Sequence, residues 1–327
     1  MDLHKVPSEQ PVVSLSLDLD NQWSYMRTHG NPGWESFPSF LDIVVPRILS
    51  FLQEQRLTIT IFMVGQDAAL AKNHAALAAI AAAGHEIGNH SFHHEPWLHL
   101  YSAQQIEHEI TQAEEHIERV TGQQPRGFRG PGYSLSPATL RVLTRRGYLY
   151  DASTLPTFLG PLARAYYFRT SSLRPEEKQQ RQALFGTLGD GFRPIRPYWW
   201  LEGQSRLLEM PVTTMPLFKL PIHVSYLLYL SGFAPAVARQ YFQAALRLCQ
   251  WTGTQPSILL HSLDFLGHDD VPSLAFFPGM KLPSEKKLAL ISEVLTALSR
   301  RYVVLTLQQH AHKAAQDPHL AYRAIAS

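Results

Sequence analysis

Two aspartates close the first strand-like segment of this 327-residue chain. In SLDLDNQW, Asp18 and Asp20 lie two residues apart, so in an extended strand their side chains point to the same side. Two carboxylates that close together are unfavourable unless a cation lies between them or one of them has a raised pKa. The pair indicates metal binding or acid–base chemistry, although aspartates also cap helices and form turns at strand ends.

A histidine cluster follows in GHEIGNHSFHHEPW. His90 and His94 are four residues apart and could share one face of a helical turn, and His93 is a rival to His94. Imidazoles with a carboxylate suit zinc and other first-row divalent ions, and three protein ligands leave a position for water, as in catalytic sites. Pro96 ends any such turn, which fixes the histidines at the end of a strand, where barrel enzymes hold their chemistry. The alternative is a cluster of surface histidines.

Three later segments add further polar groups. Arg129, in RGFRGPGYS, can hold a carboxylate in a fixed orientation, unless it is an exposed residue of a turn. Asp151 stands at another strand end, and ILLHSLDF delivers His261 and Asp264. A buried apolar strand that ends in histidine is a common way to place a general acid, although a structural histidine is the alternative.

The elements that carry these residues alternate between short apolar runs and segments of helical period, as in successive βα units. About seven strands are expected, and no glycine-rich phosphate turn follows the first, so an α/β distorted (β/α) barrel is favoured over an open doubly wound sheet. The expected strands are 12–20, 57–65, 85–90, 126–130, 206–215, 256–265 and 302–307, and the expected helices are 40–56, 73–84, 102–122, 136–147, 234–250 and 285–301.

The alternation breaks between residues 155 and 206, which we interpret as an irregular insertion in a single domain spanning residues 1–327. Arginine among aromatics, followed by the apolar segment 216–233, suits anionic head groups at a membrane interface. Alternatively, the aromatics cover the barrel and stack on sugar rings, or pack as core. The residues concerned are Arg164, Arg169, Arg174, Arg181, Arg193, Arg196, Tyr166, Tyr167, Phe168, Tyr198, Trp199 and Trp200.

Composition narrows the function classes. A formal net charge of +2 gives no reason to expect nucleic acid as a partner. The single Cys249 excludes an intramolecular disulfide, and AALRLCQW predicts a buried structural thiol. No apolar stretch of secretory length precedes the first strand, and no run reaches the roughly 20 apolar residues that cross a bilayer. We therefore expect a cytoplasmic protein that is soluble or peripheral at the inner membrane face.

Taken in order, SLDLDNQW, NHSFHHEP, FRGPGYS, YDAS and ILLHSLD resemble the motifs of the polysaccharide deacetylase family, which has the NodB homology domain and is also called carbohydrate esterase family 4. The resemblance covers residues 12–151 and 257–264 and implies a NodB-like barrel. It implies that Asp18 is the catalytic base and Asp20 a metal ligand, in the branch whose first motif is DxD.

The same resemblance implies that His90 and His94 complete a site for one divalent ion, with zinc expected first and cobalt, nickel or manganese also suited to these ligands. Glu95 departs from the family pattern, because it stands between His94 and the expected proline. The resemblance further implies that Arg129 tethers the base and that His261 protonates the leaving amine. Asp151 lies near the family's partner of that histidine, but YDAS lacks the usual tryptophan, so Asp264 stays the alternative.

The implied reaction is metal-assisted hydrolysis of an N-acyl group, expected to be acetyl, on a sugar or glycan. Cytoplasmic placement favours a lipid-linked glycan over finished cell-wall polymer. The sequence leaves open acetyl or formyl, the identity of the sugar and the oligomeric state. Two rivals are an amidohydrolase of the same fold acting on a non-carbohydrate amide, such as a cyclic ureide, and a catalytically silent glycan-binding protein. The presence of both Asp18 and His261 argues against the second rival.

Overall fold

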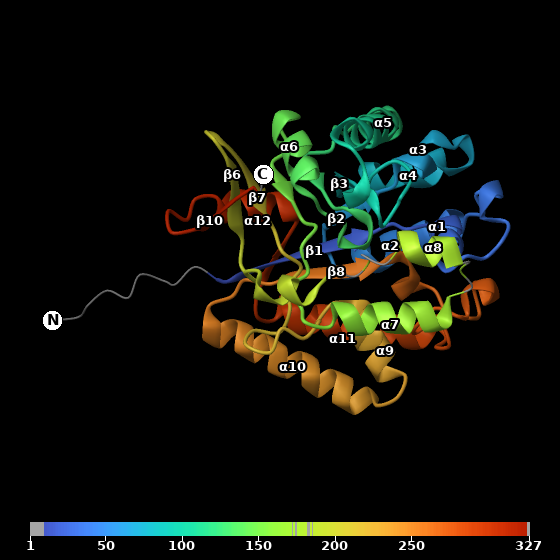
Figure 1. The fold of residues 1–327 in the computed structure, drawn as a ribbon. Helices are drawn as coiled ribbons and strands as arrows, with labels where there is room; N and C mark the ends of the chain where they lie inside the picture. Colours follow the sequence, from blue (N-terminus) through green and yellow to red (C-terminus); the bar gives the residue numbers. More distant parts are fainter. Residues whose placement is uncertain (1–9, 172, 174, 182–183, 185, 326–327) are drawn as a thin grey trace.

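The computed structural model describes residues 10–325 except 172, 174, 182, 183 and 185. Strands β1 (Val12–Asp18) and β8 (Ser257–His261) run through the middle of the molecule, with α10 and α11 on one side and α4 and α5 on the opposite side (Figure 1). Both strands are almost wholly buried, as their apolar sequences predict. Helices therefore cover the sheet on its outer sides, which is the layering of a (β/α) barrel.

The described strands form one sheet in the order β10-β6-β7-β5-β4-β3-β2-β1-β8, and β9 also pairs with β1. All ladders are parallel except that between β6 and β7, so β6 and β10 run against the others. Beyond β7, the Thr213 N–H donates to the Ser257 carbonyl, which joins the two sides of the distorted barrel. The remaining bounds are β2 (Thr60–Met63), β3 (Glu86–Asn89), β4 (Gly127–Phe128), β5 (Tyr150–Asp151), β6 (Tyr198–Glu202), β7 (Ser205–Glu209), β9 (Val303–Leu305) and β10 (Ala321–Ala324).

Strand register brings distant residues of the site together. The first residues of β1 pair with β9, whereas its last residues pair with β2 on one edge and β8 on the other. At the carboxyl end, Asp18 stands opposite Phe62 and His261. Parallel pairing therefore places Asp18 beside a histidine that lies more than 240 residues later in the chain.

The predicted helices form within a few residues of the expected bounds, because their ends carry capping residues. Ser102 and Gln105 form a capping box at the start of α5, and Gly122 ends that helix in a left-handed conformation. These helices are α2 (Leu41–Glu54), α4 (His74–Ala82), α5 (Ala103–Thr121), α6 (Pro137–Arg145), α10 (Pro235–Thr252) and α11 (Ser284–Ser299). The structure adds α1 (Gln22–His29), α3 (Gly65–Ala69), α9 (Val224–Ser231) and α12 (Leu307–Ala314), which the sequence did not predict.

The prediction that residues 155–206 are irregular is wrong for much of the segment. It contains α7 (Gly160–Thr170), α8 (Pro175–Gln180) and β6, which extends the sheet. Tyr198, Trp199 and Trp200 alternate in β6 and are all buried, because the strand is covered on both faces. Three of the six aromatics singled out in this segment therefore pack inside the protein, as the alternative interpretation expected.

The other arginines and aromatics of the segment are distributed differently. Tyr167 donates through its hydroxyl to the Thr28 carbonyl, and buried Arg181 donates to the same carbonyl. Tyr166, Arg169 and Arg196 are exposed. Arg174 lies outside the described residues. The segment therefore packs onto the end of α1 and exposes only part of its charge.

The single cysteine has the predicted surroundings. Cys249 lies on the buried side of α10, and burial raises the pKa of its thiol to about 12. A protonated thiol is a poor nucleophile. Cys249 is therefore a packing residue, as its sequence setting predicted.

Candidate active site

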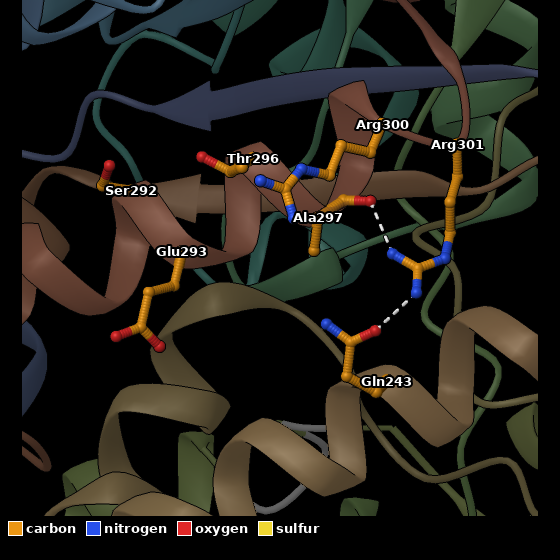
Figure 2. A pocket seen from close by; sticks show the side chains of 7 residues that line it. All are labelled: Gln243, Ser292, Glu293, Thr296, Ala297, Arg300 and Arg301. Carbon is orange, nitrogen blue, oxygen red and sulfur yellow. Dashed lines mark hydrogen bonds between the residues drawn. The ribbon is translucent and has the colours of Figure 1, made fainter.

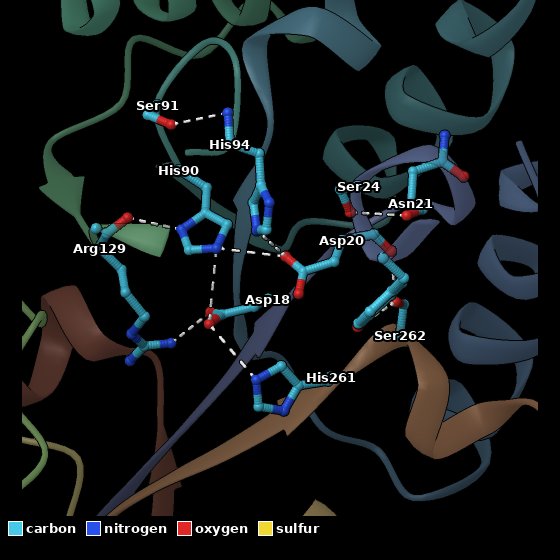
Figure 3. Close-up of polar contacts among 12 residues, drawn as sticks. Asp18, Asp20, Asn21, Ser24, His90, Ser91, His94, Arg129, His261 and Ser262 are labelled. Carbon is cyan, nitrogen blue, oxygen red and sulfur yellow. Dashed lines mark hydrogen bonds and ion pairs between the residues drawn. The ribbon is translucent and has the colours of Figure 1, made fainter. Parts of the chain in front are cut away.

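A buried ion pair joins the first and fourth strands. Arg129, directly after β4, donates through Nη1 to Oδ1 of Asp18 at 2.6 Å (Figure 3). It also donates through Nε to the Ala152 carbonyl at 3.0 Å. Its guanidinium lies 4.3 Å from the ring centre of Phe62, and the residue is fully buried. Arg129 is thus no exposed turn residue, and it fixes the orientation of the Asp18 carboxylate.

Asp20 and two histidines meet beside that pair. The Oδ1 atom of Asp20 lies 2.9 Å from Nε2 of His94 and 3.3 Å from Nε2 of His90. One ligand atom from each of these three residues lies within 4.8 Å of the others, and all three residues are buried. Burial alone would raise the pKa of Asp20, but the two histidines hold it well below its usual value.

These three residues fit a divalent cation. Oδ1 of Asp20 and both ring nitrogens of His94 are buried, and none has a hydrogen-bond partner among the described residues, since the 2.9 Å contact lacks hydrogen-bond geometry. Buried polar atoms without partners are costly, and a bound cation would satisfy them. Two imidazole nitrogens and one carboxylate oxygen are ligands of catalytic zinc sites.

The loop after β3 presents the histidines without the helical turn that their spacing suggested. Ser91 and His94 have φ angles of 61° and 51°, in the left-handed region. The Ser91 N–H donates to Oδ1 of Asn89, and the His94 N–H donates to Oγ of Ser91. His90 donates from Nδ1 to the Arg129 carbonyl at 2.6 Å, because a carbonyl can only accept. Its Nε2 is thereby left with a lone pair directed at Asp20.

His93 turns away from this cluster. Its Nδ1 lies 2.5 Å from Oε1 of Glu109, and this hydrogen bond raises the pKa of His93. The structure therefore groups His94, and not His93, with Asp20 and His90. Glu95, the departure from the family motif, forms an ion pair with Arg27 and so ties the loop to α1.

The ring of His261 faces Asp18 on one side and a serine on the other. Its Nε2 lies 3.9 Å from Oδ2 of Asp18, and its Nδ1 lies 2.9 Å from Oγ of Ser225. Asp264 accepts from the His261 backbone N–H, and among the described residues its carboxylate forms no ion pair or hydrogen bond with the ring nitrogens. Among the described residues, neither of the expected partners, Asp151 and Asp264, binds the ring of His261 through its carboxylate. Sequence reasoning missed Ser225, because nothing marks a serine within an apolar segment.

Asp151 instead belongs to a buried acidic pair. Its carboxylate accepts from the Ser153 hydroxyl at 2.6 Å, and Asp151 stands opposite Glu209, at the end of β7, in the β5–β7 ladder. Burial and then the nearby Asp151 raise the pKa of Glu209 well above its usual value. Trp200 and Thr154 also donate to Glu209. Glu209 was missed, although a glutamate that closes the apolar run RLLEM was a signal.

A hollow of about 620 Å³ lies elsewhere, between α10 and α11 (Figure 2). Arg301 donates there to the Ala297 carbonyl and to Oε1 of Gln243. None of its lining residues belongs to the cluster around Asp20. The hollow is therefore separate from the candidate active site.

Residues 34–150 match the family model described as polysaccharide deacetylase. This match confirms, over residues 34–150, the resemblance that the sequence motifs predicted. The chain is 26% identical over 169 residues to a peptidoglycan deacetylase of Helicobacter pylori. This matched segment covers 50% of this chain and 54% of that protein. The chain is also 35% identical over 105 residues to a peptidoglycan-N-acetylmuramic acid deacetylase of Bacillus subtilis. This matched segment covers 32% of this chain and 38% of the relative. The chain thus spans about half or less of the length of these relatives.

Two solved structures share the fold. A Mycobacterium smegmatis protein described as a polysaccharide deacetylase superposes with a TM-score of 0.64 at 21% identity, over 98% of this chain and 96% of that one. PuuE allantoinase superposes with a TM-score of 0.60 at 18% identity, over 96% and 93%. These matches confirm the NodB-like barrel that the sequence motifs predicted.

Proposed function

We propose that the chain is a divalent-metal-dependent hydrolase that removes an N-acetyl group from a sugar or glycan. The observation that carries the proposal is the cluster of Asp20, His90 and His94 next to the Asp18–Arg129 pair. The names of the relatives support an N-acetylated glycan as the substrate class. Zinc is the first choice of metal, because its catalytic sites combine histidine with carboxylate and keep one position open.

Two side chains of the protein, Asp18 and His261, would transfer protons at different points of the substrate. A divalent ion held by the three ligands would polarise the acyl carbonyl and lower the pKa of bound water. Asp18, held by Arg129, accepts the proton of the attacking water. His261 donates a proton from Nε2 to the leaving nitrogen, since this nitrogen faces Asp18 and the site. The buried setting excludes bulk water and strengthens these electrostatic interactions.

The test combines metal analysis with acetate release from a panel of N-acetylated sugars and glycans. We expect one equivalent of metal, acetate release that chelation abolishes, and loss of turnover in Asp18→Asn with metal retained. Bound metal with no acetate release, together with hydrolytic ring opening of a cyclic ureide, would support the rival amidohydrolase. A protein that binds glycans but binds no metal on reconstitution would contradict the proposal.

We further propose that the substrate is lipid-linked and that the enzyme works at the inner face of the membrane. Support comes from the turn between α9 and α10 and the helix ends beside it. Tyr229 in α9, Phe233 in the turn and Val237 in α10 are 38%, 76% and 52% exposed. Residues 220–238 contain no Asp, Glu, Lys or Arg. Uncharged aromatic tips of this kind suit the interfacial region of a bilayer. No helix among the described residues is long and apolar enough to cross a membrane.

Vesicle sedimentation tests the membrane proposal independently of turnover. We expect the protein to pellet with phospholipid vesicles and Phe233→Ser to weaken pelleting several-fold. Trp251→Ser is the matched control, because Trp251 is also 76% exposed but lies near the other end of α10. Equal pelleting of both variants, or no pelleting of the parent protein, would contradict the proposal. Cell fractionation checks the cytoplasmic location.

A further inference from the structure

His94 differs from His90 in how its ring is held. The Nδ1 atom of His90 donates to the Arg129 carbonyl, whereas neither ring nitrogen of His94 has a hydrogen-bond partner among the described residues. A metal-binding histidine usually donates its second ring N–H to a protein group, which fixes the direction of the ring. The direction of the His94 ring therefore depends on its backbone, which has a φ of 51° that is unfavourable for a residue other than glycine.

One arginine holds the chain on both sides of His94. Nη1 of Arg27 donates to the His93 carbonyl at 3.0 Å, and its Nη2 forms an ion pair with Oε1 of Glu95. Both side chains are mostly buried, with 18% of that of Arg27 and 9% of that of Glu95 exposed. The His94 N–H donates to Oγ of Ser91 (Figure 3). The peptide group between His93 and His94 is thus held at both its oxygen and its N–H.

Arg27 is itself fixed relative to Asp20. It lies in the last turn of α1, the helix whose N-cap residue directly follows Asp20. Its guanidinium lies 4.8 Å from the ring centre of Trp34 and 5.5 Å from that of Trp97, within the range of cation–π attraction. These contacts restrict the side chain to one orientation. The helix α1 therefore links the position of Asp20 to that of His94.

We propose that Arg27 is a positioning residue that fixes the backbone of His94 and so prepares the cluster of three metal ligands to bind a divalent cation. Arg27 provides no ligand atom of that cluster. Because the Arg27–Glu95 pair is neutral overall, its removal changes the position of His94 without changing the net charge beside the cluster. This role rests on the metal binding of the proposed function, and not on which substrate is hydrolysed.

Zinc affinity tests this role directly, measured by competition with a fluorescent chelator. The main variant combines Arg27→Met with Glu95→Gln, because the loss of both charges leaves no buried ion unpaired and no free carboxylate beside the metal. We expect this double variant to bind zinc at least roughly 10-fold more weakly than the parent, as for other groups that orient metal ligands. Zinc binding as tight as in the parent would overturn the proposal.

Two further variants separate geometry from stability and from charge. Arg146→Met with Glu114→Gln is the matched control, because this pair joins α5 to the end of α6 and the Glu114 side chain is also 9% exposed. The control should lose similar stability in urea unfolding but keep the zinc affinity of the parent. Arg27→Lys keeps the charge, but a compact ammonium does not hold two acceptors as a planar guanidinium does, so zinc should again bind more weakly. Parent affinity in Arg27→Lys, or an equal loss in the control, would contradict the role.

Cobalt provides a second readout that does not depend on turnover. The visible absorption of bound Co²⁺ depends on the geometry of its ligands, so we expect a changed band in the double variant at Arg27 and Glu95 and the parent band in the control. An unchanged band in that double variant would contradict the role. If both metals respond as expected but no acetylated sugar is turned over, N-deacetylation fails and the positioning role stands. If all variants bind zinc equally and release acetate, the role fails and the proposed function stands.

Discussion

Replacing Asp18 by Asn tests the coupling between the base and its arginine. At 2.6 Å and an effective dielectric constant of about 20, two unit charges attract by about 6 kcal/mol, part of which offsets the cost of burying them. Arg129 is fully buried, and its only ion-pair partner among the described residues is Asp18. Asp18→Asn leaves that cation uncompensated, so we expect the free energy of unfolding to fall by about 3 kcal/mol.

The assay is a double-mutant cycle of Asp18→Asn and Arg129→Met, followed by urea unfolding of the chelated protein so that metal binding does not contribute. In the Arg129→Met background, Asp18→Asn should cost less than about 1 kcal/mol, because no buried cation remains. The exposed pair Arg141–Glu202 is the control and should give a coupling below about 1 kcal/mol. Additivity of the two site mutations within about 0.5 kcal/mol would refute the reasoning.

Three further predictions concern the metal, a buried lysine and a close backbone approach. His94→Asn should lose the bound metal in elemental analysis and no longer gain thermal stability from added zinc, whereas His93→Asn should keep both; loss in both variants would refute the assignment. Burial lowers the pKa of Lys287 to about 8, so the folded state binds this proton less tightly than the unfolded chain does, and the free energy of unfolding should rise as pH increases from about 8 to 10. Urea titrations across this range should show a smaller rise in Lys287→Met, and an identical rise would refute the shift. Gly130→Ala would place a Cβ 2.0 Å from the Ser134 carbonyl oxygen, so we expect a loss of several kcal/mol in urea unfolding, whereas a loss below about 1 kcal/mol would show that the backbone can move.

Much of the barrel could be predicted because its signals are local. Apolar runs marked the buried strands, and capping residues such as Ser102 and Gly122 marked helix ends. The family motifs identified the residues that the structure brings together at the ends of β1, β3, β4 and β8. The match of residues 34–150 and the shared fold confirm that resemblance.

The missed features depend on tertiary contacts. β6 reads as irregular sequence because it is an added strand whose aromatics are buried on both faces, so it shows no alternation of polar and apolar residues. The spacing of His90 and His94 suggested a helical turn, but the side chains of Asn89 and Ser91 accept backbone hydrogen bonds that select a looped backbone. The contact of Ser225 with His261 depends on how α9 packs, which local sequence does not encode.

The pairing of β1 also sets the order in which the protein can mature during synthesis. Val12 in β1 pairs with Val303 in β9, so β1 cannot complete its pairing until the much later residues of β9 have been synthesised. At typical rates of synthesis, that wait lasts roughly 15 to 60 s, during which the apolar edge of VVSLSLD lacks its final neighbours. The ribosome-bound chain therefore contains Asp20, His90 and His94 well before His261 is made. Until β1 is paired, its free edge is where nascent chains would associate or recruit a chaperone.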